Sequence, residues 1–370
     1  MKIIVIGTRG FPNVQGGIET HCEQLYPFIV KAGCNVSVIT RKSYIDTAVK
    51  KYKGVELIPL WNTKKRSFET IIHTFCAIIK AKNMGCDIIH FHAIGPALLV
   101  PLARLLGLKV VMTNHGPDYD RQKWGWVSKL MLCLGEYLGS KFSNKVISIS
   151  KPISDNLKQK YNCNPATIPN GVIIPETINT GNALNKFSIS KKKYILTVGR
   201  FVPEKGFTDL IVAFNKSNLS DNGFKLVIVG DSDHEDKYSR NLKQTAAEDD
   251  NIVLTGFQKG LALHELFSHA KLFVLPSYHE GLPIVLLEAM SYGLSCIVSD
   301  IPANRNVNLS NDRHFNPGDT DGLANKISEF ANKNFSDEDR KLQIKIIKRD
   351  YDWEIIAKET VMVYQEVLNS

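Results

Sequence analysis

The segment EGLPIVLLEAMSYG at residues 280–293 combines residue types that can hold a phosphate group. Gly281 and Pro283 mark a turn into a helix, because proline is favoured where a helix begins. The first helical residues, Ile284 and Val285, present backbone N–H groups that have no acceptor within the helix. These donors, together with the positive end of the helix dipole, predict an anion-binding site.

Two glutamates flank this predicted helix start. Glu280 precedes the turn, and Glu288 lies one helical turn further along. We expect the Glu288 carboxylate to accept hydrogen bonds from a ribose diol, and Glu280 to contact a sugar beyond the phosphates. The alternative is that both are acidic residues placed near a helix N-terminus because the dipole favours them there. The preceding apolar strand and the Gly-Leu-Pro turn favour the ligand-binding interpretation.

Two cations occupy the segment VGRFVPEKG at residues 198–206, directly after a predicted strand. Arg200 and Lys205 therefore lie at the carboxyl end of that strand, where doubly wound sheets bind their ligands. Fixed cations there would stabilise the charge that grows on a nucleoside diphosphate as its bond to a sugar breaks. Taken alone, the segment is explained equally well by a solvated pair of charges in a turn.

A glycine pair lies in the segment GTRGFPNVQGGIET at residues 7–20, which leads from the first predicted strand into a helix. Gly16 and Gly17 allow the backbone to approach a ligand closely. Gly7 and Gly10 do not have the spacing of the dinucleotide-binding fingerprint, which weakens a nicotinamide-binding interpretation.

A single histidine, His115, follows the predicted strand at residues 109–113 within the segment TNHGPDYD. In a two-domain α/β architecture this strand end faces the cleft between the domains. The sequence favours a structural and a functional role for this histidine about equally.

Short apolar runs rich in β-branched residues predict the strands, since such runs suit strands buried on both faces of a parallel sheet. They lie at residues 2–7, 35–40, 55–60, 87–92, 109–113, 145–150, 194–199, 224–230, 251–256, 272–276 and 295–300. Helical segments are predicted near residues 18–32, 67–83, 96–106, 124–141, 152–160, 205–216, 235–248, 261–269 and 284–292. The alternation predicts an α/β protein with two tandem Rossmann-like, doubly wound domains that face each other across a cleft.

The predicted boundaries follow from where this alternation pauses. Residues 1–170 form a first domain, a polar linker rich in Pro, Gly, Asn and Ser covers 171–192, and residues 193–350 form a second domain. The last stretch, 351–370, is predicted to be an amphipathic helix.

Composition limits the protein class. The chain has 370 residues, 44% of them hydrophobic. This length exceeds that of one ordinary α/β domain, so two domains are expected. No apolar run reaches the ~20 residues of a membrane span. The seven cysteines are odd in number and lack a CxxC spacing, so a disulfide framework or zinc site is disfavoured. The start MKIIVIG is typical of a first strand rather than a signal peptide, so we expect a cytoplasmic protein.

Positive charge is concentrated in the first half of the chain. Residues 1–180 carry a formal net charge of +12 and the remainder −3, giving +9 in total. Such asymmetry indicates a partner with phosphates, either nucleic acid or an anionic membrane surface. No motif that reads nucleic acid is present.

The segment 121–145 mixes basic residues with Trp124, Trp126 and an apolar stripe. It is typical either of a helix on a membrane surface or of a core-packed helix with a basic outer face.

These motifs together resemble glycosyltransferase family 4, a retaining family with the two-domain GT-B fold. The segment 280–293 resembles its pair of glutamates with seven residues between them. The segment 198–206 resembles its phosphate-binding turn, and IPNGV at 168–172 its inter-domain strand end. The opening segment 7–20 resembles a subgroup found with O-antigen and capsule synthesis. The similarity spans nearly the whole chain, including the final helix, which in the family crosses back onto the N-terminal domain.

The resemblance implies a role for each motif. Phe257 would lie at the nucleobase, Glu280 at the transferred sugar and His115 beside the reacting centre. The implied donor-binding residues are Gly17, Arg200, Lys205, Phe257, Gly281, Ile284, Val285 and Glu288. The implied catalytic residues are His115, Glu280, Arg200 and Lys205. The implied acceptor-side residues are Arg9, Gly16, Gly17 and Asp118.

No metal ion or cofactor is expected, and the Asp231-x-Asp233 string is interpreted as a strand-end turn rather than a metal motif. The predicted function is retaining transfer of a hexose from a UDP-, GDP- or dTDP-linked sugar to a saccharide acceptor in cell-surface polysaccharide synthesis. We expect a polyprenyl-diphosphate-linked acceptor and peripheral contact of the N-terminal half with the inner face of the cell membrane. The alternatives are a sugar-nucleotide epimerase on the same fold and a non-catalytic membrane-associated partner protein.

Overall fold

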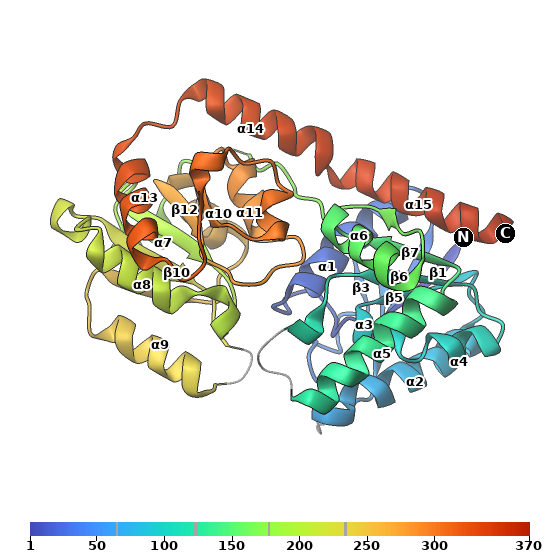
Figure 1. The fold of residues 1–370 in the computed structure, drawn as a ribbon. Coiled ribbons are helices and arrows are strands. Elements are labelled where there is room, and N and C mark those ends of the chain that lie inside the picture. The colour runs from blue at the N-terminus through green and yellow to red at the C-terminus, as the bar shows by residue number, and fades with distance from the viewer. Residues whose placement is uncertain (64–65, 121–124, 177, 233–234) are drawn as a thin grey trace. The chain divides into compact units, whose positions relative to one another are not determined.

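The computed structural model divides the chain into two compact units (Figure 1). Unit 1 comprises Met1–Gly171 together with Tyr351–Ser370, and unit 2 comprises Val172–Asp350. The structure describes all residues except 64–65, 121–124, 177 and 233–234. Trp124 and Asp233, which the sequence analysis singled out, therefore lie outside the described residues.

Unit 1 is built on one eight-stranded sheet with the order β3-β4-β2-β1-β5-β6-β7-β8. Its strands are β1 (Lys2–Ile6), β2 (Asn35–Arg41), β3 (Lys51–Tyr52), β4 (Val55–Leu60), β5 (Ile88–His92), β6 (Val110–Asn114), β7 (Lys145–Ser148) and β8 (Ala166–Thr167). All neighbours pair in parallel except β3 and β4. The apolar runs are explained by this topology, because central parallel strands are covered on both faces.

Helices cover both faces of this sheet. They are α1 (Gly17–Lys31), α2 (Arg66–Met84), α3 (Ile94–Ala97), α4 (Val100–Leu105), the 3-10 turn η1 (Asp118–Asp120), α5 (Trp126–Phe142), α6 (Lys151–Tyr161) and α15 (Trp353–Asn369). In β1, Ile3 and Val5 join the core under α1 and α15, whereas Ile4 and Ile6 join the core under α2 to α4. The final helix of the chain is thus part of unit 1.

Unit 2 repeats this plan with a six-stranded sheet of order β11-β10-β9-β12-β13-β14, parallel throughout. The strands are β9 (Tyr194–Val198), β10 (Lys225–Val229), β11 (Ile252–Gly256), β12 (Leu272–Leu275), β13 (Ser295–Ser299) and β14 (His314–Phe315). The helices are α7 (Asn182–Lys186), α8 (Phe207–Lys216), α9 (Lys237–Ala247), α10 (Gly260–His269), α11 (Ile284–Ser291), α12 (Pro302–Arg305), α13 (Thr320–Asn332) and α14 (Asp337–Asp350). Short 3-10 turns are η2 (Pro203–Lys205), η3 (Ser220–Asn222) and η4 (Asn311–Arg313).

The prediction of two parallel, doubly wound α/β domains is confirmed, but several elements were not predicted from the sequence. The strands β3, β8 and β14 have two residues each, too few to show any periodicity. Helices α13 and α14 were also missed. The stretch 171–192, predicted to be a linker, contains helix α7, and unit 2 already begins at Val172. This helix was not predicted because the stretch is polar and shows no apolar periodicity. It packs against α10.

Candidate active site

Strands β9 and β12 are neighbours in the sheet of unit 2, so the loops that follow them lie side by side. Arg200 and Lys205 belong to the first loop, and Glu280 belongs to the second. The two loops are tied by a backbone hydrogen bond from Tyr278 N to Glu204 O of 2.8 Å. Gly206, with φ +66°, packs so closely on Pro276 that a Cβ atom would lie 2.2 Å from the Pro276 carbonyl oxygen. A side chain at this glycine would separate the loops.

Lys205 and Glu280 form an ion pair within this loop pair. The Lys205 Nζ lies 2.5 Å from Glu280 Oε1, and the side chains are 18% and 12% exposed. The Ser277 hydroxyl donates a 2.7 Å hydrogen bond to the same carboxylate oxygen. The residues predicted to bind the diphosphate and the sugar are therefore adjacent, and each orients the other.

A buried network of hydrogen bonds holds the start of the loop that carries Glu280. The Ser299 hydroxyl donates to the carbonyl oxygen of Ser277, and Asn304 Nδ2 donates to the carbonyl oxygen of Ser299 over 2.8 Å. All three residues are fully buried. Because β12 and β13 are paired, this network fixes the start of the loop relative to the sheet.

Helix α11 begins immediately after this loop, as predicted. Its first backbone hydrogen bonds run from Leu286 N and Leu287 N to the Pro283 carbonyl oxygen. Among the described residues, the N–H groups of Ile284 and Val285 have no acceptor, and both residues are partly exposed. The turn at Gly281 thus leads to a helix end with two donors available to an anion.

Glu288 lies on α11 in an apolar environment. Burial raises the pKa of its carboxyl group to about 7. The side chain is partly exposed, and no described residue forms a hydrogen bond or ion pair with its carboxylate. A carboxyl group that lacks a protein partner and still reaches solvent is a candidate for hydrogen bonding to a ligand.

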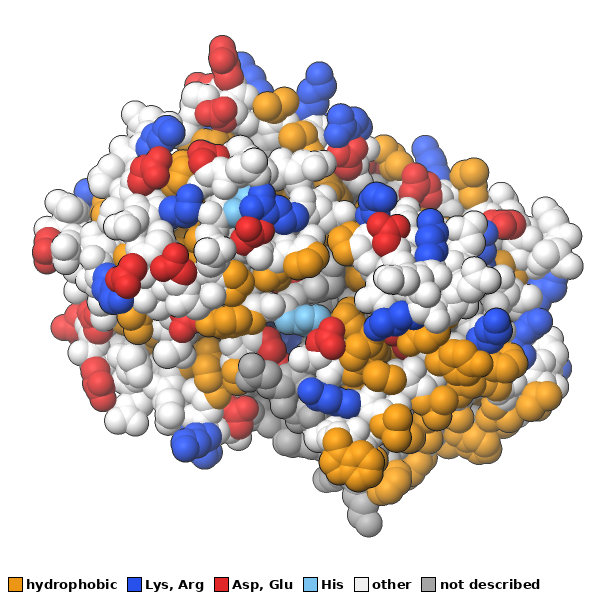
Figure 2. All heavy atoms as spheres, viewed as in Figure 1, with side chains coloured by type: hydrophobic (Ala, Val, Ile, Leu, Met, Phe, Trp, Pro, Cys, Tyr) orange, Lys and Arg blue, Asp and Glu red, His pale blue; other side chains and the backbone are white. Residues whose placement is uncertain are grey.

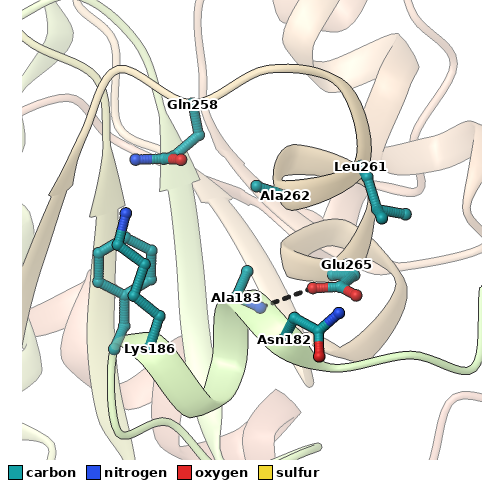
Figure 3. A pocket seen from close by; sticks show the side chains of 8 residues that line it. Asn182, Ala183, Lys186, Gln258, Leu261, Ala262 and Glu265 are labelled. Atoms are coloured by element: carbon teal, nitrogen blue, oxygen red, sulfur yellow. Dashed lines mark hydrogen bonds between the residues drawn. The ribbon is translucent and has the colours of Figure 1, made fainter.

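Phe257 follows β11 directly, and its side chain is 44% exposed. The next residue, Gln258, lines a pocket of about 310 Å³ between α7 and α10 (Figure 3). None of the predicted site residues lines this pocket. Its glutamate, Glu265, accepts a 2.7 Å hydrogen bond from the Ala183 backbone N–H and thereby holds the start of α7. We therefore assign this glutamate a structural role.

Asp231, the first residue of the Asp-x-Asp string, forms an ion pair with Lys243 at 2.9 Å. Its carboxylate also accepts a hydrogen bond from Ser232 N. Both contacts are typical of the strand-end turn that was predicted for this position.

In unit 1, the glycine pair lies where helix α1 begins. Arg9 turns toward Glu19 of this helix, with its Nε 3.2 Å from Glu19 Oε1, and Arg9 N donates to the same oxygen over 3.0 Å. Gly16 has φ +153°, and a Cβ atom there would collide with the Glu19 carboxylate. Nothing lies within 4 Å of a Cβ atom at Gly17. Gly16 therefore makes room for the Arg9–Glu19 pair, while Gly17 leaves open space above the backbone.

His115 belongs to a cluster of histidines in unit 1. Its Nε2 lies 2.9 Å from Nδ1 of His92 at the end of β5, and its ring centroid lies 4.9 Å from that of His21 on α1. Burial lowers the pKa of His21 to about 4 and the pKa of both other rings well below the ordinary value. All three rings are neutral near pH 7. Of the three, His115 alone was predicted from the sequence, although the strand sequence IHFH places polar residues within an apolar run.

A buried glutamate of α5 holds the loop that carries His115 and Asp118. Glu136, 2% exposed, accepts hydrogen bonds from Asn114 Nδ2 at 3.0 Å and from the Tyr119 hydroxyl at 2.9 Å. Glu136 was not predicted as a site residue from the sequence, because its neighbours on α5 belong to an ordinary apolar stripe. Asp118 begins the 3-10 turn η1 within the same loop.

The outer faces of α5 and α2 carry large exposed hydrophobic side chains (Figure 2). We call this set the apolar face; it consists of Phe68, Ile72, Phe75 and Ile79 on α2 and Trp126, Val127, Leu130, Met131, Leu134 and Tyr137 on α5. Trp126 is 78% exposed and Leu130 is 62% exposed. Both helices also expose lysines. The stripe on α5 therefore faces outward, unlike that of a core-packed helix. Within the described part of the chain, no helix is long and apolar enough to span a membrane.

Both halves of the chain match glycosyltransferase families. Residues 182–350 match the family described as glycosyl transferases group 1, and residues 15–174 match glycosyltransferase family 4. An uncharacterized glycosyltransferase of Methanocaldococcus jannaschii is 27% identical over 394 residues, which cover 99% of this chain and 98% of that protein. The UDP-Gal:alpha-D-GlcNAc-diphosphoundecaprenol alpha-1,3-galactosyltransferase of Escherichia coli is 26% identical over 312 residues, 78% of this chain and 77% of the relative. The protein is a glycosyltransferase.

Solved structures agree on the fold. Sucrose-phosphate synthase from Thermosynechococcus elongatus superimposes with a TM-score of 0.82 at 20% identity, covering 100% of this chain and 99% of that one. Anabaena HepE in complex with UDP and glucose superimposes with a TM-score of 0.78 at 16% identity, covering 99% and 100%. The two Rossmann-like units therefore form a GT-B fold, as predicted. The assignment of individual site residues rests on the geometry described above and stays a prediction.

Proposed function

We propose that this glycosyltransferase moves a hexose from a nucleoside-diphosphate sugar to a saccharide acceptor with retention of the anomeric configuration. The observation that carries the proposal is the arrangement in unit 2 of the Lys205–Glu280 pair beside the open N-terminus of α11. A diphosphate needs cations and N–H donors, and a sugar needs a carboxylate next to them.

In the proposed reaction, Arg200, Lys205 and the N–H groups at the start of α11 neutralise the donor diphosphate. The bond between the anomeric carbon and the phosphate oxygen breaks while a bond from the acceptor hydroxyl oxygen to that carbon forms on the same face. The acceptor proton passes to the departing phosphate oxygen. Arg200 and Lys205 lower the barrier because charge on the leaving group is greatest in the transition state.

We further propose that the donor is linked to UDP. The E. coli relative is named for a UDP-Gal donor, and the Anabaena structure contains UDP and glucose. In this chain, Glu288 would hold the ribose hydroxyls and Phe257 would lie against the base. Arg200, Lys205 and the α11 donors do not require a divalent metal ion to neutralise the diphosphate, so transfer is expected to proceed in EDTA.

The acceptor is proposed to be a saccharide on a polyprenyl diphosphate in the cytoplasmic leaflet, in cell-surface polysaccharide synthesis of the O-antigen or capsule type. The apolar face of α5 and α2 and the excess of basic residues in 1–180 support contact with an anionic membrane. The E. coli relative is named for an acceptor of this chemical class.

A thermal-shift panel of UDP, GDP and dTDP tests the donor site. A nucleotide present at 100 times its dissociation constant stabilises the folded protein by about 2.7 kcal/mol. We expect UDP to raise the melting temperature and Glu288→Ala to reduce this shift. Glu248→Ala, at an exposed glutamate of the same unit, should leave it unchanged. If none of the nucleotides stabilises the protein, the proposed donor site is wrong.

A transfer assay with a short synthetic polyprenyl-diphosphate saccharide and UDP-sugars then tests the reaction. We expect sugar transfer that depends on the acceptor and persists in EDTA. Conversion of the UDP-sugar to its epimer without acceptor would instead establish the alternative function of an epimerase.

A further inference from the structure

Three histidines of unit 1 converge on one point. His21 comes from α1, His92 from the end of β5, and His115 follows β6 directly. One ring nitrogen from each lies within 4.8 Å of the others. Strands β5 and β6 pair in parallel, with His92 opposite Thr113, so the sheet itself brings two of the rings together.

In two of these rings, the nitrogen that points away from the cluster, here called the outer nitrogen, already has a hydrogen-bond partner. His21 Nδ1 lies 2.8 Å from Asn170 Oδ1, and His92 Nε2 lies 2.5 Å from the Tyr26 hydroxyl. A histidine that donates its N–H to such a partner has its lone pair on the other nitrogen, which points into the cluster. Metal-binding histidines in proteins are oriented in this way.

The inner nitrogen of His21 is the second, independent observation. His21 is 3% exposed, and its Nε2 is buried without a hydrogen-bond partner among the described residues. Leaving a buried polar atom unpaired has a cost in free energy. Since His21 Nδ1 is bonded to Asn170, Nε2 is the nitrogen left for a cation held among the three rings, and binding of such a cation would remove that cost.

We propose that His21, His92 and His115 together bind one divalent transition-metal ion such as Zn²⁺. Three imidazoles and a solvent molecule make a tetrahedral site, with zinc–nitrogen distances of about 2.0–2.1 Å. The hydrogen bond between His92 and His115 gives way to two metal bonds, and its proton moves from His115 Nε2 to the outer nitrogen, Nδ1, of the same ring. Imidazole ligands select zinc, cobalt, nickel or copper over magnesium and calcium.

Zinc bound to these three histidines should affect sugar transfer, and this effect rests on the proposed function. The reaction proposed above requires no metal, and the resemblance to glycosyltransferase family 4 implies that His115 lies beside the reacting centre. A metal ion on His115 takes this ring away from the substrate. Zinc is therefore an inhibitor of this enzyme rather than its cofactor, and removing zinc with a chelator restores activity.

Metal binding is measured on the full chain without a polyhistidine tag. Zinc is titrated in competition with a chromogenic chelator, and Co²⁺ binding is followed by its visible absorption, which is intense for tetrahedral sites. We expect one ion per chain, no effect of Mg²⁺, and loss of the stoichiometric site in His21→Ala. The control His264→Ala, at an exposed histidine of α10, should bind as the wild type does.

A second variant keeps all three ligands and guards against misfolding of His21→Ala. Asn170→Ala removes the hydrogen bond that orients His21 and should weaken zinc affinity about 10–100-fold. Absence of a stoichiometric ion in the wild type, or equal binding in wild type, His21→Ala and Asn170→Ala, would overturn the metal site. Stoichiometric binding without inhibition would confirm the site and contradict the role of His115 in transfer.

Discussion

The ammonium group of Lys205 lies 2.5 Å from the carboxylate of Glu280, although the two residues are 75 positions apart in the chain. The pair joins the loop after β9 to the loop after β12 and is largely shielded from solvent. It means that the cation assigned to the diphosphate and the carboxylate assigned to the sugar are pre-oriented by each other. Donor binding therefore requires little rearrangement of these two side chains, which favours the transition state.

Replacing Lys205 by alanine is expected to lower kcat about 10²–10³-fold, because one fixed charge opposite the leaving diphosphate is lost. Arg200→Ala should behave similarly. Steady-state kinetics with saturating UDP-sugar measure the effect. Lys216→Ala is the matched control, since Lys216 pairs with Asp321 at 2.8 Å on the exposed surface. Turnover near the wild-type value in both Lys205→Ala and Arg200→Ala would place the active site elsewhere.

Donor affinity is expected to depend on the protonation of Glu288. Burial raises the pKa of this carboxyl group to about 7. The ionised form accepts two hydrogen bonds from a ribose diol, so the dissociation constant of the donor should rise as pH falls below 7. Glu288→Ala should weaken binding by about 1–3 kcal/mol at pH 8. Glu288→Gln should give an affinity that no longer changes with pH.

Calorimetry with a UDP-sugar measures this pH dependence. UDP itself is unsuitable because its terminal phosphate titrates near pH ~6. An unchanged affinity in Glu288→Ala, or the same pH dependence in Glu288→Gln as in the wild type, would contradict the assignment of Glu288 to the ribose.

The stability of unit 2 should fall as pH rises through the same range. The pKa of Glu288 is raised from 4.5 to about 7 on folding, so the folded state binds the proton more tightly than the unfolded state. This contribution to stability is fully present below pH 4.5 and is lost as pH rises through 7. Glu288→Gln is thus expected to raise the free energy of unfolding at pH 8 by about 1–3 kcal/mol. Melting curves below pH 4.5 and at pH 8, with Glu248→Gln as control, detect the difference. A stabilisation that is equal at low and high pH would argue against a raised pKa of Glu288.

Loss of the Glu136 carboxylate should affect both stability and turnover. This side chain accepts hydrogen bonds from Asn114, Tyr119 and Tyr161. Glu136→Ala removes the acceptor of the buried Asn114 amide and of two partly exposed tyrosine hydroxyls, and should cost about 1–3 kcal/mol. Tyr161→Phe removes one bond alone and should cost about 1 kcal/mol. Because the loop from Asn114 to Tyr119 carries His115, kcat should fall in Glu136→Ala more than in Tyr161→Phe. Kinetics below the melting temperature of both variants test this order, and the reverse order would refute a positioning role.

Binding to membranes is expected to require the apolar face and anionic lipid. Liposome co-sedimentation should show binding to anionic but not neutral vesicles, and salt should weaken it because charges are screened over about 8 Å at physiological ionic strength. The double variant Trp126→Ser with Leu130→Ser should reduce binding strongly. Leu342→Ser, which alters an equally exposed leucine on α14, is the control. Wild-type protein that stays in the supernatant at low salt would show that the apolar face does not bind lipid.

Much of the architecture could be predicted because parallel strands leave a strong local signal. A central strand such as β1 is covered on both faces, so Ile3, Ile4, Val5 and Ile6 are all apolar and fully buried. The start of helix α11 could also be predicted from the sequence, because Gly281 and Pro283 shape a turn through their own backbone preferences. The polar stretch around α7 carries no such signal, since its helix is five residues long and is held by Glu265 from a distant segment.

Sequence by itself thus determined the two α/β units, the loops at the carboxyl ends of β9 and β12, and the start of α11, because each depends on residues close together in the chain. Tertiary structure decided which side chains meet. Lys205 pairs with Glu280, Glu136 supports the loop of His115, and His21 joins His92 and His115 across three separate elements. Burial likewise sets the pKa of Glu288, since the free energy of ionising a carboxyl group depends on the solvent excluded by its neighbours in space.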